Sequence, residues 1–179
     1  MKRIPLILVI LLVIINFSSC ERDDICVDGD TPFLIIGFFD FNDSTSFKEV
    51  PSLRIRAISN NAILGDNADE SESFGFTDRI GVTDSIFIPL RLDNNSTSFE
   101  FIMDSADDDM EMENGNIDIL GFSYTIGEQF VSRGCGFVAN YNELDTLRTV
   151  STEDWIRGII VQENNVTNNP TFIHVKILH

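Results

Sequence analysis

The acidic segment at residues 104–118 holds the side chains best suited to bind a metal ion. It carries seven carboxylates, and Ca²⁺ takes about six to eight oxygen ligands from a flexible loop. The candidate ligands are Asp107, Asp109 and Glu111. Counting from Asp107, however, Met112 stands where an EF-hand loop needs glycine and Asp118 where it needs glutamate. Runs of charge are most often solvated, so we expect an acidic surface here, with a calcium site as the alternative.

Histidine is the side chain that most often serves as a general base, and the sequence has two, His174 and His179. His174 shares a strand face with Lys176, so we expect its side chain to point toward solvent or a loop. A nucleophile elbow needs glycines on both sides of its serine, and residues 121–125, Gly-Phe-Ser-Tyr-Thr, have only the first. The sequence also lacks a glycine-rich phosphate loop and paired zinc-binding cysteines. We therefore expect no enzymatic activity and no cofactor.

Aromatic side chains that could stack on sugar rings are the remaining candidates for ligand binding. The amphipathic ones are Trp155, Tyr124 and Tyr141. Trp155 follows an acidic turn and precedes an apolar stretch, which is more often the setting of a packing residue. Trp155 is thus a weak candidate for ligand binding, and a carbohydrate-binding module is an alternative function.

Cys20 has the surroundings of a lipidated cysteine. A basic pair at residues 2–3, an apolar run over residues 4–15 and small residues before Cys20 form the layout of an export signal. The run is shorter than the roughly 20 apolar residues of a transmembrane helix. Residues 17–20, Phe-Ser-Ser-Cys, resemble a lipobox, although an aliphatic residue is usual in the place of Phe17. We predict a signal helix over residues 1–19 and lipidation of Cys20, with a plain signal peptide as the alternative.

Assigning Cys20 to the lipid leaves an even pair, Cys26 and Cys135. Exported proteins fold in oxidising compartments, where such pairs form disulfides. We predict a disulfide between Cys26 and Cys135, which would add about 4 kcal/mol of stability at most. A reactive thiol at Cys135 is the alternative, but only Arg133 lies close to it in the sequence.

The charge of the chain argues against one class of partner. The formal net charge is −17, and removal of Lys2 and Arg3 with the signal lowers it to −19. Nucleic-acid binding needs clustered basic side chains that displace counterions from phosphates. We therefore expect no nucleic-acid partner and interpret the acidity as favouring solubility.

The candidate residues named above must be positioned by short strands, which the sequence marks by alternating apolar and polar residues. The expected strands cover residues 33–39, 53–58, 86–90, 98–103, 117–126, 129–132, 137–141, 156–162 and 172–178. The polar loop at residues 93–97 predicts a hairpin between the strands that flank it. We predict an all-β fold, an antiparallel β-sandwich of immunoglobulin-like or transthyretin-like topology, with a barrel as the less favoured alternative.

The chain has no repeat and no proline-rich or serine-rich linker, so we expect one folded domain over residues 31–179. Residues 20–30 form the lipidated cysteine and an acidic tether. Within this tether, residues 21–24, Glu-Arg-Asp-Asp, resemble the signal that sends lipoproteins of Bacteroidota to the cell exterior. A solvated tether without a signal is the alternative.

Several segments together resemble an uncharacterised lipoprotein family of Bacteroidota, of flavobacterial type. They are residues 20–32 with Cys26, residues 132–137, Ser-Arg-Gly-Cys-Gly-Phe, and residues 174–177, His-Val-Lys-Ile. The resemblance implies paired cysteines and an all-β lipoprotein domain. It supplies no established activity and no catalytic residue.

Four tripeptides resemble an O-glycosylation motif of the same bacteria. They begin at Asp43, Asp84, Asp104 and Asp145. The alternative is that these are turns, in which Asp and Ser side chains bond to the backbone.

Together these patterns favour a membrane-anchored lipoprotein of the cell envelope, held at the outer membrane and facing the periplasm or the exterior. We expect a non-enzymatic binding or envelope-assembly module. Its expected partners are the membrane, through the lipid anchor, and an envelope protein or a glycan. The alternative is an accessory module of glycan utilisation.

Overall fold

The structure is a computed structural model that describes residues 31–58, 79–107, 110, 112–147, 154–167 and 172–179. These residues form nine strands. The strands are β1 (Leu34–Phe39), β2 (Val50–Ala57), β3 (Ile80–Thr83), β4 (Ser85–Ile88), β5 (Ser96–Met103), β6 (Asn116–Ser132), β7 (Gly136–Leu147), β8 (Gly158–Val161) and β9 (Val175–Leu178). Within the described residues, no helix is long and apolar enough to cross a membrane.

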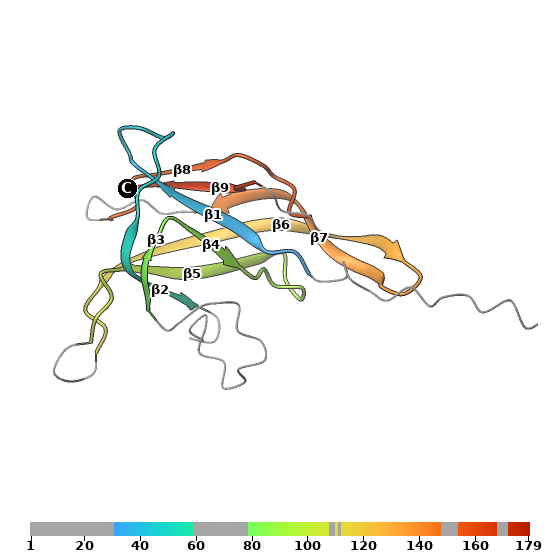
Figure 1. Cartoon of the computed structure of the whole chain (residues 1–179). Helices are drawn as coiled ribbons and strands as arrows, with labels where there is room; N and C mark the ends of the chain where they lie inside the picture. Colours follow the sequence, from blue (N-terminus) through green and yellow to red (C-terminus); the bar gives the residue numbers. More distant parts are fainter. Residues whose placement is uncertain (1–30, 59–78, 108–109, 111, 148–153, 168–171) are drawn as a thin grey trace, which may run out of the picture.

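The strands form two sheets that pack face to face (Figure 1). One sheet has the order β4-β1-β9-β8 and the other β3-β2-β5-β6-β7. All neighbouring strands are antiparallel except β1 and β9, which run parallel. The prediction of an all-β sandwich is confirmed. An immunoglobulin domain places its first two strands in one sheet, whereas β1 and β2 lie in different sheets here.

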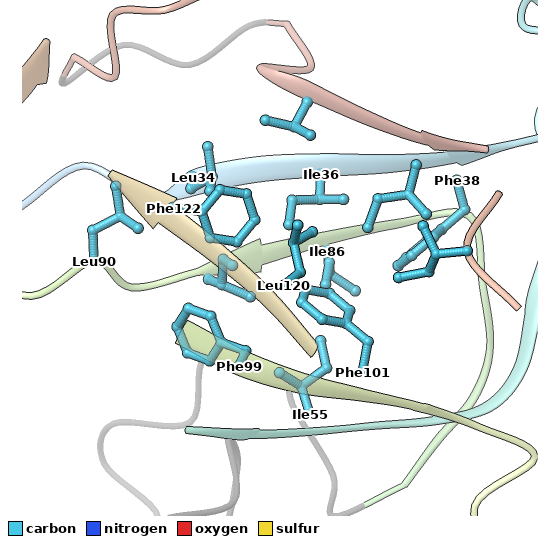
Figure 2. Packing of buried hydrophobic residues seen from close by; sticks show 14 of the residues in the cluster. Leu34, Ile36, Phe38, Ile55, Ile86, Leu90, Phe99, Phe101, Leu120 and Phe122 are labelled. Atoms are coloured by element: carbon cyan, nitrogen blue, oxygen red, sulfur yellow. The ribbon is translucent and has the colours of Figure 1, made fainter. Parts of the chain in front are cut away.

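Every second side chain along the strands points inward, and these side chains fill the space between the sheets. On β5, Phe99 and Phe101 point inward, whereas Glu100 lies on the outer face opposite Arg56 of β2. Figure 2 shows these phenylalanines in one cluster with Ile36 of β1 and Ile86 of β4 from the other sheet. Burying each such side chain contributes about 1.5–3 kcal/mol, so the alternation itself specifies which face of each strand is buried.

Strand β1 is buried along its whole length on both faces. Its inner face packs into the core, and its outer face is covered by other segments: Ile173 approaches Gly37, and Phe47 stacks on Phe39 with ring centroids 4.5 Å apart. A strand covered on both sides needs an almost continuous apolar sequence. This explains the uninterrupted run that the sequence shows at this strand.

The hairpin predicted between residues 86–90 and 98–103 is not present. Strand β4 pairs with β1 in one sheet, with Ile86 opposite Ile36, while β5 pairs with β2 and β6 in the other. The connecting segment therefore crosses from sheet to sheet. Pro89 has no N–H group to donate to a ladder, so the pairing ends where the chain changes sheets.

Strands β6 and β7 form a long hairpin that extends beyond the rest of the sandwich (Figure 1). Two expected strands, 117–126 and 129–132, are one strand of 17 residues, β6, with register shifts at Ser123/Thr125 and Phe130/Ser132. Residues 127–137 form the end of this hairpin and are called the hairpin tip below. The tip lies on the side of the molecule toward which the start of β1 points, opposite the C-terminus (Figure 1).

Candidate functional site

An open cleft of about 510 Å³ lies at the end of the sandwich that holds the C-terminus. Its charged and ring-bearing lining residues are Lys48, Glu49, Asp154, Trp155, Arg157 and His179. They come from the segment before β2, the segment before β8 and the residue after β9. We call this site the C-terminal cleft.

Trp155 lies beneath this cleft and belongs to the core. Its side chain is only 6% exposed, and its indole N–H donates to the carbonyl of Phe101 at 3.2 Å. Its ring meets His179 edge to face, with centroids 5.5 Å apart, and also contacts Phe38. A ring held in this way cannot offer its face to a sugar, so Trp155 is a packing residue here and not the candidate ligand residue.

His179 is held by hydrogen bonds at both its ring and its backbone. Its Nε2 lies 3.2 Å from the carbonyl of Lys48, which can only accept, so Nε2 carries the proton. The Lys48 ammonium donates to the carbonyl of His179 at 2.8 Å. Burial lowers the pKa of His179, an effect that the hydrogen bond to the Lys48 carbonyl opposes. The neutral imidazole of His179, which donates a hydrogen bond to the backbone, therefore has a structural role.

The rim of the cleft carries both signs of charge. Lys48 lies 3.8 Å from the carboxylate of Asp40, and the Arg157 guanidinium lies over the ring of Phe41 at 5.7 Å. Glu49 and Asp154 add carboxylates to the same lining. A small polar ligand with opposite charges would match this rim.

The two tyrosines are buried as well. Tyr124 and Tyr141 meet edge to face, with centroids 4.9 Å apart. Their hydroxyls donate to the carbonyls of Arg91 and Leu90 at 2.9 and 3.0 Å. Burial raises the pKa of Tyr141 to about 12. The aromatic platform that the glycan-binding alternative needs is therefore not formed by Trp155, Tyr124 and Tyr141.

At the acidic segment, arginines pair with two of the described carboxylates, Asp107 and Glu113. Arg79 is hydrogen-bonded to Asp107 and donates to the hydroxyl of Ser105 at 2.9 Å. Arg54 on β2 donates to Glu113 at 2.9 Å, and the Ser105 hydroxyl donates to the same carboxylate at 2.8 Å. This network joins the base of the acidic segment to the second sheet.

Glu113 is the centre of that network. Burial alone would raise its pKa, but hydrogen bonds from Arg54, from the N–H groups of Gly115 and Ala106 and from the Ser105 hydroxyl lower it to about 2. The ionised form is thus bound strongly at neutral pH. The role of Glu113 is to hold the two ends of the acidic segment together.

Of the three candidate calcium ligands, only Asp107 is described, and it faces arginines. Asp109 and Glu111 lie outside the described residues. Among the residues that the structure describes, no group of three or more His, Cys, Asp or Glu side chains could hold a metal ion. The calcium site therefore stays an alternative, and the described residues do not supply a set of ligands for it.

His174 was expected to point toward solvent or a loop, and the solvent alternative is wrong, since this residue is 1% exposed. Its Nδ1 accepts the N–H of Ile35 at 3.0 Å, and its own N–H donates to the carbonyl of Ile35 at 2.9 Å. Phe172 lies edge-on to the ring, with centroids 5.3 Å apart. Alternation assigned His174 to the outer face of its strand, but that face is itself covered. Burial lowers its pKa, and the charge of Glu163 partly opposes this.

The predicted lipid and disulfide sites are only partly described. Cys20 and Cys26 lie outside the described residues, so the lipidation and the Cys26–Cys135 disulfide stay predictions. Cys135 lies in the turn of the hairpin tip, where its N–H donates to the hydroxyl of Ser132 at 3.1 Å.

The sequence patterns missed the exposed aromatic pair at this tip. Phe130 and Phe137 are 54% and 67% exposed, face each other across the hairpin, and lie with centroids 5.4 Å apart. The expected strands 129–132 and 137–141 contain these residues, but no prediction was made of whether their side chains are exposed. The signal that could have revealed them is the turn sequence between them, which places both residues at the end of a hairpin.

Comparison with known protein families places most of the chain in a family. The family of unknown function DUF6452 matches residues 52–179. No curated protein and no solved structure matches the chain. The match supplies no ligand, no activity and no catalytic residue.

Proposed function

The chain belongs to the family of unknown function DUF6452, and from its own residues we propose that it is a lipid-anchored, non-enzymatic binding module of the bacterial cell envelope. The proposed anchor is a lipid on Cys20, and the proposed location is the outer membrane, as in the lipoproteins of Bacteroidota that the sequence resembles. The sandwich would then face the periplasm or the exterior on a tether formed by residues 20–30.

One observation carries the non-enzymatic part of this proposal. The rings that could act as acids, bases or stacking surfaces are used to hold the fold: His174 and His179 bond to backbone groups of Ile35 and Lys48, and the Trp155 indole bonds to Phe101. Each of these rings is less than a tenth exposed. Among the described residues, the mixed-charge rim of the C-terminal cleft and several apolar side chains are open to solvent. Such surfaces support binding.

The anchor is tested by metabolic labelling with an alkyne fatty acid in the native host or a related bacterium. The full chain is expected to take up the label and to fractionate with membranes, while Cys20→Ala should lose both because the thiol that carries the lipid is gone. Cys135→Ala is the matched control and should keep the label. Labelling that persists in Cys20→Ala would contradict the proposal.

The binding role is tested by crosslinking in cells and identification of what co-purifies with the protein. Charge-reversal of the cleft rim by Lys48→Glu together with Arg157→Glu should remove a partner bound there. A partner that is retained by this variant would exclude the C-terminal cleft as its site.

A further inference from the structure

Among the described residues, the hairpin tip combines two exposed aromatic side chains with zero net charge. Residues 127–137 contain one glutamate, Glu128, and one arginine, Arg133, so their net charge is zero in a chain of −17. Phe130 and Phe137 stand at this tip with more than half of each side chain exposed. Their rings contact each other across the hairpin, and the tip extends past the two sheets (Figure 1).

The position of the tip relates it to the N-terminal part of the chain. The start of β1 points toward the same side of the molecule as the tip (Figure 1). The tip also contains Cys135, the predicted partner of Cys26. Cys26 lies six positions after Cys20, and six extended residues span at most about 21 Å. A disulfide to Cys135 adds at most about 7 Å between the two Cα atoms, so it would keep Cys135 within about 28 Å of Cys20.

From these observations we infer that the hairpin tip inserts Phe130 and Phe137 into the interfacial region of the lipid bilayer. This inference rests on the proposed lipid anchor. Phenylalanine is among the side chains that membrane-surface segments bury at the boundary of headgroups and acyl chains, and a neutral tip avoids the repulsion that anionic headgroups exert on the rest of an acidic chain. The lipid holds the protein at the bilayer, and the aromatic pair fixes which end faces it.

Fluorescence quenching by lipid tests the inference with the full lipidated chain. Phe137→Trp is compared with Phe87→Trp, because Phe87 on β4 is similarly exposed, at 47%, but lies outside the tip. Both variants are placed in vesicles of phosphatidylcholine whose acyl chains carry bromine. Trp155 contributes the same buried background to each.

We expect the emission of Phe137→Trp to shift to shorter wavelength and to lose most of its intensity, while Phe87→Trp keeps its emission. Equal quenching of the two variants, or none in Phe137→Trp, would overturn the inference. A blue shift of Phe137→Trp that depends on protein concentration and needs no vesicles would also overturn it, because a second copy would then cover the tip.

The proposed anchor has a separate readout in the same experiment. If the wild-type chain pellets with vesicles and Cys20→Ala does not, the anchor stands whatever the tip does. Absence of lipid on the wild-type chain would contradict both proposals. As a control for folding, the double variant Phe130→Ser with Phe137→Ser should melt at the wild-type temperature, since both side chains are exposed.

Discussion

At the end of the sandwich that holds the C-terminus, Trp155 and His179 pack edge to face beneath the C-terminal cleft, each with a hydrogen bond to the backbone. At the opposite end, Phe130 and Phe137 contact each other in solvent. The first pair carries polar atoms and is buried, whereas the second pair is purely apolar and exposed. This arrangement reverses the usual preference for burial, so the cleft end is fixed by the fold and the tip is left available to another surface.

The largest expected difference between the two ends is in stability. Trp155→Ala should lower the free energy of unfolding by about 3–5 kcal/mol, because it leaves a cavity between the sheets. Phe137→Ala should change it by less than about 0.5 kcal/mol, since the side chain is largely exposed. Chemical denaturation of the two variants measures this. Similar losses in both would mean that the tip is as fixed as the cleft end.

The next effect concerns the network that holds the acidic segment. Glu113→Ala should cost about 1–3 kcal/mol, because it removes the acceptor of Arg54 and of two backbone N–H groups. Asp107→Ala is the matched control and should cost less than about 1 kcal/mol, as it is a more exposed ion pair. If thermal melts rank the two in the opposite order, the segment is not held by Glu113.

A pH series separates the buried histidines from the tip. Burial lowers the pKa of His174 from its ordinary 6.5, so below that pH the unfolded chain binds the proton more readily than the folded chain. The free energy of unfolding should be fully retained above pH 6.5 and decline from there toward pH 4.5, where Glu113 begins to titrate in the unfolded chain. His174→Gln keeps an acceptor for the N–H of Ile35 and should flatten the decline, whereas Phe137→Ala should not. A wild-type slope in His174→Gln would refute this assignment.

The smallest effect is expected at the rim of the cleft. Lys48→Met removes an ammonium that donates to the His179 carbonyl and lies near Asp40. The lysine side chain is partly exposed, so the loss should be about 1 kcal/mol or less. Differential scanning calorimetry can measure this loss in Lys48→Met. Phe87→Ser, which changes an exposed residue on β4, is the control. A loss as large as that of Trp155→Ala would place Lys48 within the core and not at its rim.

Alternation in the sequence was sufficient to predict the sandwich and most of its strands, although β3 (Ile80–Thr83) was missed. Residues 98–103 alternate because one face of β5 is buried, and the uninterrupted run at β1 reflects burial on both faces. The order of the strands was not predictable, since alternation reports which face is buried and not which strand lies alongside. The prediction of a hairpin between β4 and β5 was wrong for this reason.

The same limit explains the misplaced site residues. His174 was assigned to an outer face that other segments cover, and the exposure of Phe137 at the end of a hairpin was not predicted. Both depend on what packs against a strand, which is a property of the whole fold. The partners of Arg54 and Arg79 at Asp107 and Glu113 were equally hidden, because they lie far apart along the chain.

Hydrogen–deuterium exchange on the lipidated protein compares the two ends in a single measurement. On transfer from detergent to phosphatidylcholine vesicles, exchange should slow at residues 128–137 and stay unchanged at residues 154–157. That result would show the tip against the bilayer and the C-terminal cleft away from it. Slower exchange at residues 154–157, with the tip unchanged, would contradict this account.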